Sequence, residues 1–211
     1  VQRERLFTAL PYFNKPLHHG SRLVLKDGYL FIGMGEKTDL KDSAQTLNNH
    51  LGKVLRIYED GRIPEDNPYV NTPDAKPEIW SYGHRNVQAL AINPASGEPW
   101  EIEHGPRGGD EVNVLKAGQN YGWPIISDGR YYSGRKVSPV PYKEGITRPH
   151  ISYVPAIAPG GMVFYTGDKF PGWKRNLLLG SMRMSNSPRT GHIERIVFNE
   201  NWEVIRSEML L

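Results

Sequence analysis

Hydrogen-bonding side chains are concentrated in residues 81–124, a stretch that lies between two short apolar runs. Its first part contains Arg85, Asn86 and Gln88, which offer a guanidinium fork and two amides within four residues. Such groups suit a flat ligand that is rich in carboxylate and carbonyl oxygens. A structural explanation is also open, in which Arg85 pairs with a nearby acid and the amides satisfy the backbone of their own loop.

The second part of this stretch carries groups that suit a cation. Gly105 and Pro106 can expose successive backbone carbonyls, and proline has no competing N–H. Hard cations such as Ca²⁺ bind carbonyl oxygens of this kind. Asp110 and Glu111 follow two glycines, and in an extended backbone their carboxylates would point to opposite sides and could serve two sites. Taken alone, a Gly-Gly-Asp-Glu segment is more often a solvated turn than a metal site.

A third set of groups flanks the first predicted hairpin. His18 precedes one of its strands and Glu36 follows the other, so the hairpin can bring an imidazole and a carboxylate to one rim. A carboxylate that orients a histidine makes it a better general base. The alternative is that His18 and its neighbour His19 are exposed polar residues ahead of a strand.

The elements that must position these groups are β-strands. Three hairpins are predicted, which pair residues 22–25 with 29–32, 89–92 with 100–103, and 162–165 with 177–179. Further strands are expected at 51–58, 193–198 and 202–205, and residues 38–49 could form one short helix. With 22 glycines and 17 prolines among 211 residues, the chain is rich in turns, which favours an all-β fold.

The three main hairpins end alike, in short segments that contain Gly35, Gly105 and Gly180. These glycines recur at a nearly constant interval, which suggests one structural unit repeated about three times. If each unit is a small antiparallel sheet in a radial arrangement, as in a β-propeller, the ends of equivalent strands open on one face. The residues that follow these hairpins, Glu36, His104 and Arg183, would then approach one another.

Composition and charge narrow the functional classes. A net charge of +3 without a basic stripe does not indicate nucleic acid, and no apolar run approaches the roughly 18 residues of a membrane span. Without cysteine, disulfides and thiolate metal sites are excluded. The motifs of serine hydrolases, P-loop proteins, zinc proteases and nicotinamide enzymes are absent. The first residues lack a methionine and do not resemble a signal peptide, so we expect a mature or excised piece.

Motifs at residues 18–23, 83–86, 104–111 and 120–124 resemble those of the soluble glucose/sorbosone dehydrogenases that depend on pyrroloquinoline quinone, with the bacterial aldose sugar dehydrogenases most similar. This resemblance implies a six-bladed β-propeller of four-stranded antiparallel blades, of which residues 1–211 would form about three. It also implies an aldose sugar as substrate, an external electron acceptor, and a periplasmic or secreted location.

Position by position, the resemblance gives each candidate residue a role. His18 would take the proton from the anomeric hydroxyl of the sugar, with Glu36 as the acid beside it. The residues that would contact or lie near the quinone are Arg85, Asn86, Gln88, Asp110 and Arg183. The carbonyls of Gly105 and Pro106 would ligate the Ca²⁺ of the quinone, whereas Glu111 and Tyr121 match a second, structural Ca²⁺ position.

The chain departs from the family pattern in three respects. Ser21 replaces a glycine of the motif, which is a modest change unless that position requires a positive φ. Arg183 stands where the family has a lysine that contacts the cofactor, and arginine is not an equivalent donor at close range. With about three blades of the propeller, we expect the 211-residue chain alone to be inactive, because a pocket that lacks several walls cannot preorganise the reacting groups. A second hypothesis is therefore open: a non-catalytic, Ca²⁺-binding propeller segment that binds a glycan or a protein partner. The oligomeric state is not predicted.

Overall fold

The structure of the chain is a computed structural model that describes residues 3–14, 16–185, 187 and 189–210. In these ranges the regular elements are β-strands and two short 3-10 helices, which confirms the predicted all-β class. The strands form three four-stranded antiparallel sheets, and within each sheet the order in space follows the order in the chain. No helix in the described ranges has the length and apolar character that crossing a membrane requires.

The first sheet contains β1 (Gly20–Lys26), β2 (Tyr29–Met34), β3 (Lys53–Tyr58) and β4 (Ile79–Tyr82). The second sheet contains β5 (Val87–Ile92), β6 (Pro99–Glu103), β7 (Asp110–Val114) and β8 (Ile151–Tyr153). The third sheet contains β9 (Pro159–Phe164), β10 (Leu177–Ser181), β11 (His192–Phe198) and β12 (Val204–Met209). The 3-10 helices are η1 (Lys41–Gln45) and η2 (Pro171–Trp173).

The three predicted hairpins are confirmed as β1-β2, β5-β6 and β9-β10, and the predicted pair near the C-terminal end is β11-β12. The short helix expected within 38–49 is η1. The sequence patterns do not predict β4, β7 or β8. The polar composition of β7 hides it, but β7 pairs with β6 on one side and β8 on the other, and this pairing overrides its weak strand preference.

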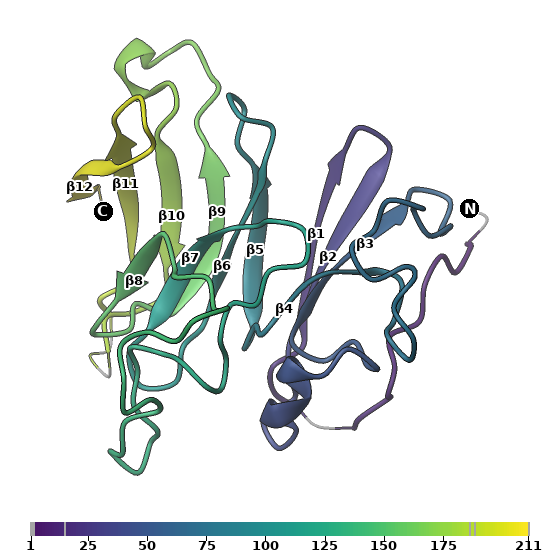
Figure 1. The fold of residues 1–211 in the computed structure, drawn as a ribbon. Coiled ribbons are helices and arrows are strands. Elements are labelled where there is room, and N and C mark those ends of the chain that lie inside the picture. Colours follow the sequence, from purple (N-terminus) through teal and green to yellow (C-terminus); the bar gives the residue numbers. More distant parts are fainter. Residues whose placement is uncertain (1–2, 15, 186, 188, 211) are drawn as a thin grey trace.

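The sheets follow one another across the molecule (Figure 1), and their first strands lie side by side. β1 contacts β5, and β5 in turn contacts β9. Such contacts between the first strands are the arrangement expected of radially placed sheets. They bring the segments that flank β1, β5 and β9 to a common end of the molecule.

Apolar side chains fill the spaces between the sheets. Between the second and third sheets, Trp100 and Ile102 pack with Phe164, Leu177 and Ile196. The packing between the first and second sheets is smaller and includes Phe31, Val54, Val87 and Leu115. Burial of such side chains contributes about 1.5–3 kcal/mol each, which makes the contact between the second and third sheets a main source of stability.

Candidate functional site

A cavity of about 380 Å³ lies where segments from all three sheets meet. His18 precedes β1, Arg85 precedes β5, Gly105 and Pro106 follow β6, and Arg183 follows β10, and all of them line this cavity. The structure therefore brings together six of the predicted site residues at this cavity, because Asp110 of β7 lines it as well. His104 also lines the cavity, so two of the three residues expected to converge there, His104 and Arg183, do so directly.

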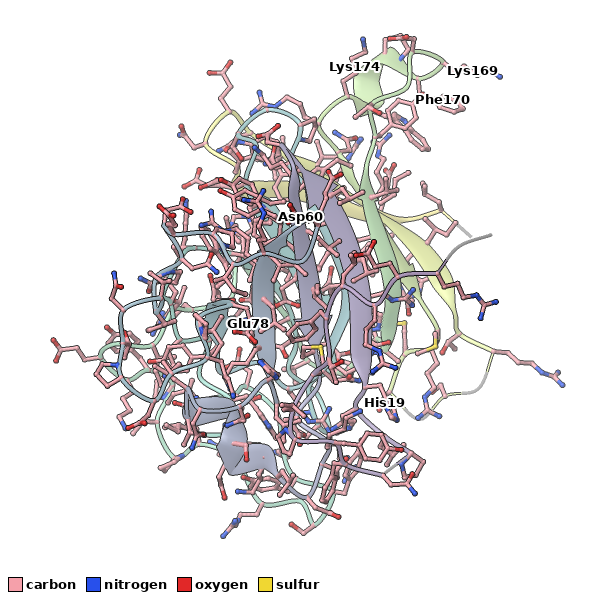
Figure 2. The ribbon with its side chains drawn as sticks, turned by 90° about the vertical axis from the view of Figure 1, so that its right-hand side faces the viewer. His19, Asp60, Glu78, Lys169, Phe170 and Lys174 are labelled. Carbon is pink, nitrogen blue, oxygen red and sulfur yellow. The ribbon has the colours of Figure 1, made fainter. Side chains whose placement is uncertain are left out.

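The position of this cavity can be followed in Figure 2 from His19, the neighbour of His18. His19 lies at the end of the sheets opposite the β9-β10 loop, which carries Lys169, Phe170 and Lys174. The cavity therefore lies at the end where β1 and β9 begin. His19 itself is exposed, whereas His18 is partly buried.

His18 is held by the acid predicted to lie beside it. Its Nδ1 lies 2.8 Å from Oε1 of Glu36, a carboxylate that is 1% exposed, and 3.3 Å from the hydroxyl of Thr38. Assigned from these bonds, Nδ1 carries the proton donated to Glu36, which leaves Nε2 for a ligand in the cavity. A Cβ at Gly35 would lie 1.9 Å from the His18 carbonyl oxygen, so the close approach of these segments requires glycine.

Arg85 does not form the acid pair of the structural explanation. Its Nη1 donates to the carbonyl oxygens of His104 at 2.9 Å and Gly105 at 2.6 Å, and its guanidinium lies over the ring of Trp123 at 5.1 Å. Burial lowers the pKa of Arg85, and the negative charge of Glu36 opposes this shift. The charged guanidinium thus stands at a carbonyl that the resemblance assigns to Ca²⁺.

The two amides of the 85–88 segment lie outside the residues that line the cavity. Asn86 is buried, and its Oδ1 accepts the backbone N–H of Gly20 at 3.0 Å, which ties the segment ahead of β5 to the start of β1. Gln88 is partly buried within β5. Asn86 thus bonds backbone as the alternative expects, but this backbone belongs to the start of β1 and not to its own loop.

Asp110 and Glu111 are adjacent in β7 and face different cavities. Asp110 is 1% exposed and lines the cavity of His18 and Arg85, whereas Glu111 lines a second cavity of about 250 Å³. Both carboxylates are buried, so the alternative of a solvated turn is wrong here. It fails because β7 is an internal strand, whose alternating side chains enter the two buried faces of its sheet.

The Asp110 carboxylate organises the backbone around the first cavity. Its Oδ1 accepts the N–H of Gly105, and its Oδ2 accepts those of Ile157 and Ala158, each at 2.8 Å. Burial raises the pKa of Asp110, although these backbone donors favour the anion. Asp110 therefore fixes the Gly105 segment relative to the segment that leads into β9.

The second cavity contains groups that suit a cation. Burial, followed by the charges of Glu103 and Glu101, raises the pKa of Glu111 well above its usual range, and Asp128 lines the same space. Ser152 Oγ is buried there without a partner among the described residues. The Tyr121 hydroxyl is already used, since it donates to Val114 O at 2.6 Å and accepts the N–H of Lys116 at 2.9 Å. Of the polar groups of Tyr121, the backbone carbonyl is therefore the one that remains available to bind a metal.

Sequence reasoning missed a buried charged cluster beside the first cavity. It consists of His84, Glu101 and Glu103, whose nearest ligand atoms lie within 4.8 Å of one another. Burial disfavours a charged His84, but the two carboxylates outweigh this and raise the pKa of His84 to about 9. The available signal was the alternation of Glu101 and Glu103 with Trp100 and Ile102, which predicts a strand but not that its acidic face is buried.

His104 joins the second sheet to the third. Its Nε2 lies 2.7 Å from the carbonyl oxygen of Pro159 and donates to it. Burial lowers the pKa of His104, which favours the neutral ring. Arg183 lies at the rim of the cavity and is exposed, so it contributes positive charge without the tight packing that surrounds Arg85.

Comparison with known proteins identifies the family. The family model for glucose/sorbosone dehydrogenase matches residues 1–211, and the chain therefore belongs to this family. Among curated proteins, the aldose sugar dehydrogenase YliI of Escherichia coli is 42% identical over 181 residues, which cover 84% of this chain and 48% of that protein. The chain thus spans about half the length of the curated relatives it matches.

Solved structures agree with this assignment. The apo-form of the soluble aldose sugar dehydrogenase from E. coli has a TM-score of 0.89 and 37% identity, and the match covers 98% of this chain and 58% of that one. An aldose sugar dehydrogenase from Streptomyces coelicolor in its form bound to pyrroloquinoline quinone has a TM-score of 0.69 and 25% identity. This second match covers 93% of this chain and 50% of that chain.

Proposed function

We propose that this chain is the central part of a quinoprotein dehydrogenase that oxidises aldose sugars at the anomeric carbon and passes the electrons to an external acceptor. The observation that carries this proposal is the His18–Glu36 pair, which lies at the wall of a cavity that also contains Arg85, Gly105 and Pro106. An oriented imidazole beside cationic groups and exposed carbonyls is what a base next to an anionic quinone requires.

The residues of the cavity fit pyrroloquinoline quinone and Ca²⁺. Arg85 and Arg183 supply positive charge for the carboxylates of the quinone. The Gly105 carbonyl accepts an N–H of the Arg85 guanidinium at 2.6 Å, so its second lone pair is the one that would face Ca²⁺. Among the described residues, no donor is assigned to the Pro106 carbonyl, which would leave it for Ca²⁺. Glu111, Asp128 and the Tyr121 carbonyl would hold a second, structural Ca²⁺ in the other cavity.

The chain's own residues would bind the sugar and move its proton. Glu36 keeps the Nδ1 proton of His18 in place, so the Nε2 lone pair accepts the proton of the anomeric hydroxyl as its O–H bond breaks. When bound, the quinone supplies the two-electron acceptor for the hydride leaving the anomeric carbon, and Ca²⁺ polarises its carbonyl. The charge on the resulting imidazolium is stabilised by the buried Glu36 carboxylate.

For the whole protein we propose a six-bladed β-propeller, in which residues 1–211 form a partial propeller of three blades. Apolar side chains on the outer sheets support it: Leu23 and Leu25 of β1 are 60% and 59% exposed, and Val163 of β9 is 56% exposed. Neighbouring blades would cover such side chains. The periplasmic or secreted location, like the external acceptor, is proposed from the family.

The test compares two adjacent histidines in the protein at its full natural length, loaded with quinone and Ca²⁺. We expect dye reduction in the presence of an aldose sugar. His18→Ala is expected to lower kcat by about 10²–10⁴-fold, because the general base is lost, while quinone affinity is retained. His19→Ala is the matched control, since His19 is exposed at the next position, and its kcat is expected to stay close to that of the unaltered protein.

Two results would count against this function. Unchanged turnover in His18→Ala would exclude His18 as the base. Absence of dye reduction with every aldose tested, together with Ca²⁺ binding, would favour the non-catalytic segment that binds a glycan or a protein partner. The 211-residue chain alone is expected to show no turnover, because half of the cavity wall would be missing in a six-bladed protein.

A further inference from the structure

We propose that Glu103 is a positioning residue that orients Arg85 and thereby sets the affinity of the cavity for the quinone. Glu103 does not line the first cavity, which contains His18 and Arg85, and it would not touch the sugar. Its effect on quinone binding rests on the function proposed above. Its effect on the orientation of Arg85 does not, because that follows from contacts within the chain.

Glu103 contacts the segment that leads into β5. One oxygen, Oε2, accepts the backbone N–H groups of both Arg85 and Asn86, the latter at 3.1 Å. Glu103 is 3% exposed, so water does not replace these bonds. Two N–H groups on one fixed oxygen orient the backbone of Arg85, because the Arg85 N–H belongs to the peptide unit before this residue and the Asn86 N–H to the one after it.

The side chain of Arg85 connects this backbone to the cavity. The guanidinium of Arg85 donates to the carbonyls of His104 and Gly105, the two residues that follow Glu103 in the chain. The backbone bonds the same segments again, since the His104 N–H donates to the Asn86 carbonyl at 3.1 Å. The Glu103 carboxylate thus fixes the backbone of Arg85. The Arg85 guanidinium in turn binds the carbonyls of His104 and Gly105. A displaced Arg85 backbone would move the guanidinium and both carbonyls together.

The His84 ring anchors the carboxylate of Glu103. Its second oxygen, Oε1, lies 3.6 Å from Nδ1 of His84, an ion-pair distance at which the charged ring attracts Oε1 while Oε2 faces the amides. The His84 ring is fixed by Ser81 Oγ at 2.9 Å from Nε2 and by stacking on Tyr121, with ring centroids 4.7 Å apart. Because His84 is fully buried, the carboxylate cannot swing away from the amides without breaking this packing.

Glu101 provides a matched control within the same strand. Its Oε1 lies 3.6 Å from the same His84 nitrogen, and it is fully buried. It differs in its other contact, because its Oε1 accepts Nδ2 of Asn113 at 2.6 Å instead of the amides of Arg85 and Asn86. Glu101 and Glu103 share their side-chain type, their histidine and their face of β6. A difference between variants at these positions therefore reports on the amide contact.

The experiment uses Glu103→Met, Glu101→Met and Glu103→Gln in the protein at its full natural length. Pyrroloquinoline quinone is titrated calorimetrically in the presence of Ca²⁺, and hydrogen exchange of the amides of Arg85 and Asn86 is followed without quinone. Glu103→Met is expected to raise Kd about tenfold or more and to speed exchange, because two buried N–H groups lose their acceptor. Glu103→Gln keeps an oxygen for both amides, so we expect it to restore most of the affinity and protection.

Glu101→Met is expected to lower stability but to change Kd less than about threefold, since it leaves both amides bonded. Equal increases in Kd for Glu103→Met and Glu101→Met, or unchanged amide exchange in Glu103→Met, would overturn the proposal. If Glu103→Met does not fold, Glu103→Asp gives the same test, because the shorter side chain keeps its charge but withdraws its oxygen. If the unaltered protein binds no quinone, the proposed function fails, while the exchange measurements still decide whether Glu103 positions Arg85.

Discussion

The two faces of β6 are both buried, but one is apolar and the other is charged. Trp100 and Ile102 point into the packing between the second and third sheets, where the Trp100 ring lies 5.3 Å from that of Phe164. Glu101 and Glu103 point to the other side and meet His84. Hydrophobic burial stabilises the first face, whereas the second requires that charges be desolvated and paired.

A half-buried histidine and a fully buried one sharpen this contrast. His150 packs against Trp100, with ring centroids 4.7 Å apart, and burial lowers its pKa. His84 lies between two carboxylates, which raise its pKa to about 9 in spite of burial. The apolar face thus keeps its histidine neutral, and the acidic face keeps its histidine charged. The charged face costs more desolvation than apolar side chains of the same size, and in return it supplies the oxygen that accepts the N–H groups of Arg85 and Asn86.

The largest effect is expected from Trp100→Ala, which removes the main ring of the apolar face. The free energy of unfolding should fall by about 3–5 kcal/mol, because a large side chain with almost no exposure leaves a cavity. Urea unfolding measures this change, and quinone titration of the folded variant is the companion measurement. We expect the quinone Kd to change little. A strong loss of quinone affinity in a folded Trp100→Ala protein would show that the two faces are not separate in function.

His84→Phe is expected to lower the free energy of unfolding by about 3 kcal/mol at pH 7, a smaller loss than that of Trp100→Ala. The two buried carboxylates lose their cation, whereas an aromatic ring that can stack on Tyr121 is kept. The pKa of His84 is raised on folding, so its contribution is present below its ordinary value of about 6.5 and is lost as pH rises through about 9. The difference between variant and unaltered protein should therefore shrink between pH 7 and pH 10. Urea unfolding at both pH values checks it, and a constant difference would mean that the His84 charge does not stabilise the fold.

Part of this molecule could be predicted from local pattern. The short apolar runs on either side of Asp27-Gly28 predict the first hairpin, and because His18 and Glu36 flank that hairpin, their juxtaposition follows from it. The carbonyls of Gly105 and Pro106 and the side chain of Arg85 were expected at one site, and they line one cavity.

The strand β7, the burial of the acidic face of β6 and the partner of Asn86 could not be predicted, because they depend on contacts between segments that are far apart in the sequence. β7 is hidden because its polar side chains face partners that only the fold supplies, such as Glu101 for Asn113. The alternation in β6 predicts a strand, but an acidic face looks the same in sequence whether it meets water or His84. Asn86 is a similar case, since its partner, the Gly20 N–H, lies 66 residues earlier in the chain.

The central claim is that the cavity between the three sheets binds pyrroloquinoline quinone through Ca²⁺, and one calorimetric titration tests it most directly. The protein at its full natural length is titrated with quinone, first with Ca²⁺ and then after removal of Ca²⁺ by a chelator. We expect one quinone to bind per chain. Binding should be lost when Ca²⁺ is removed and regained when Ca²⁺ is restored, because the carbonyls of Gly105 and Pro106 would reach the quinone through the ion. Absence of binding, or binding that is unchanged by removal of Ca²⁺, would contradict it.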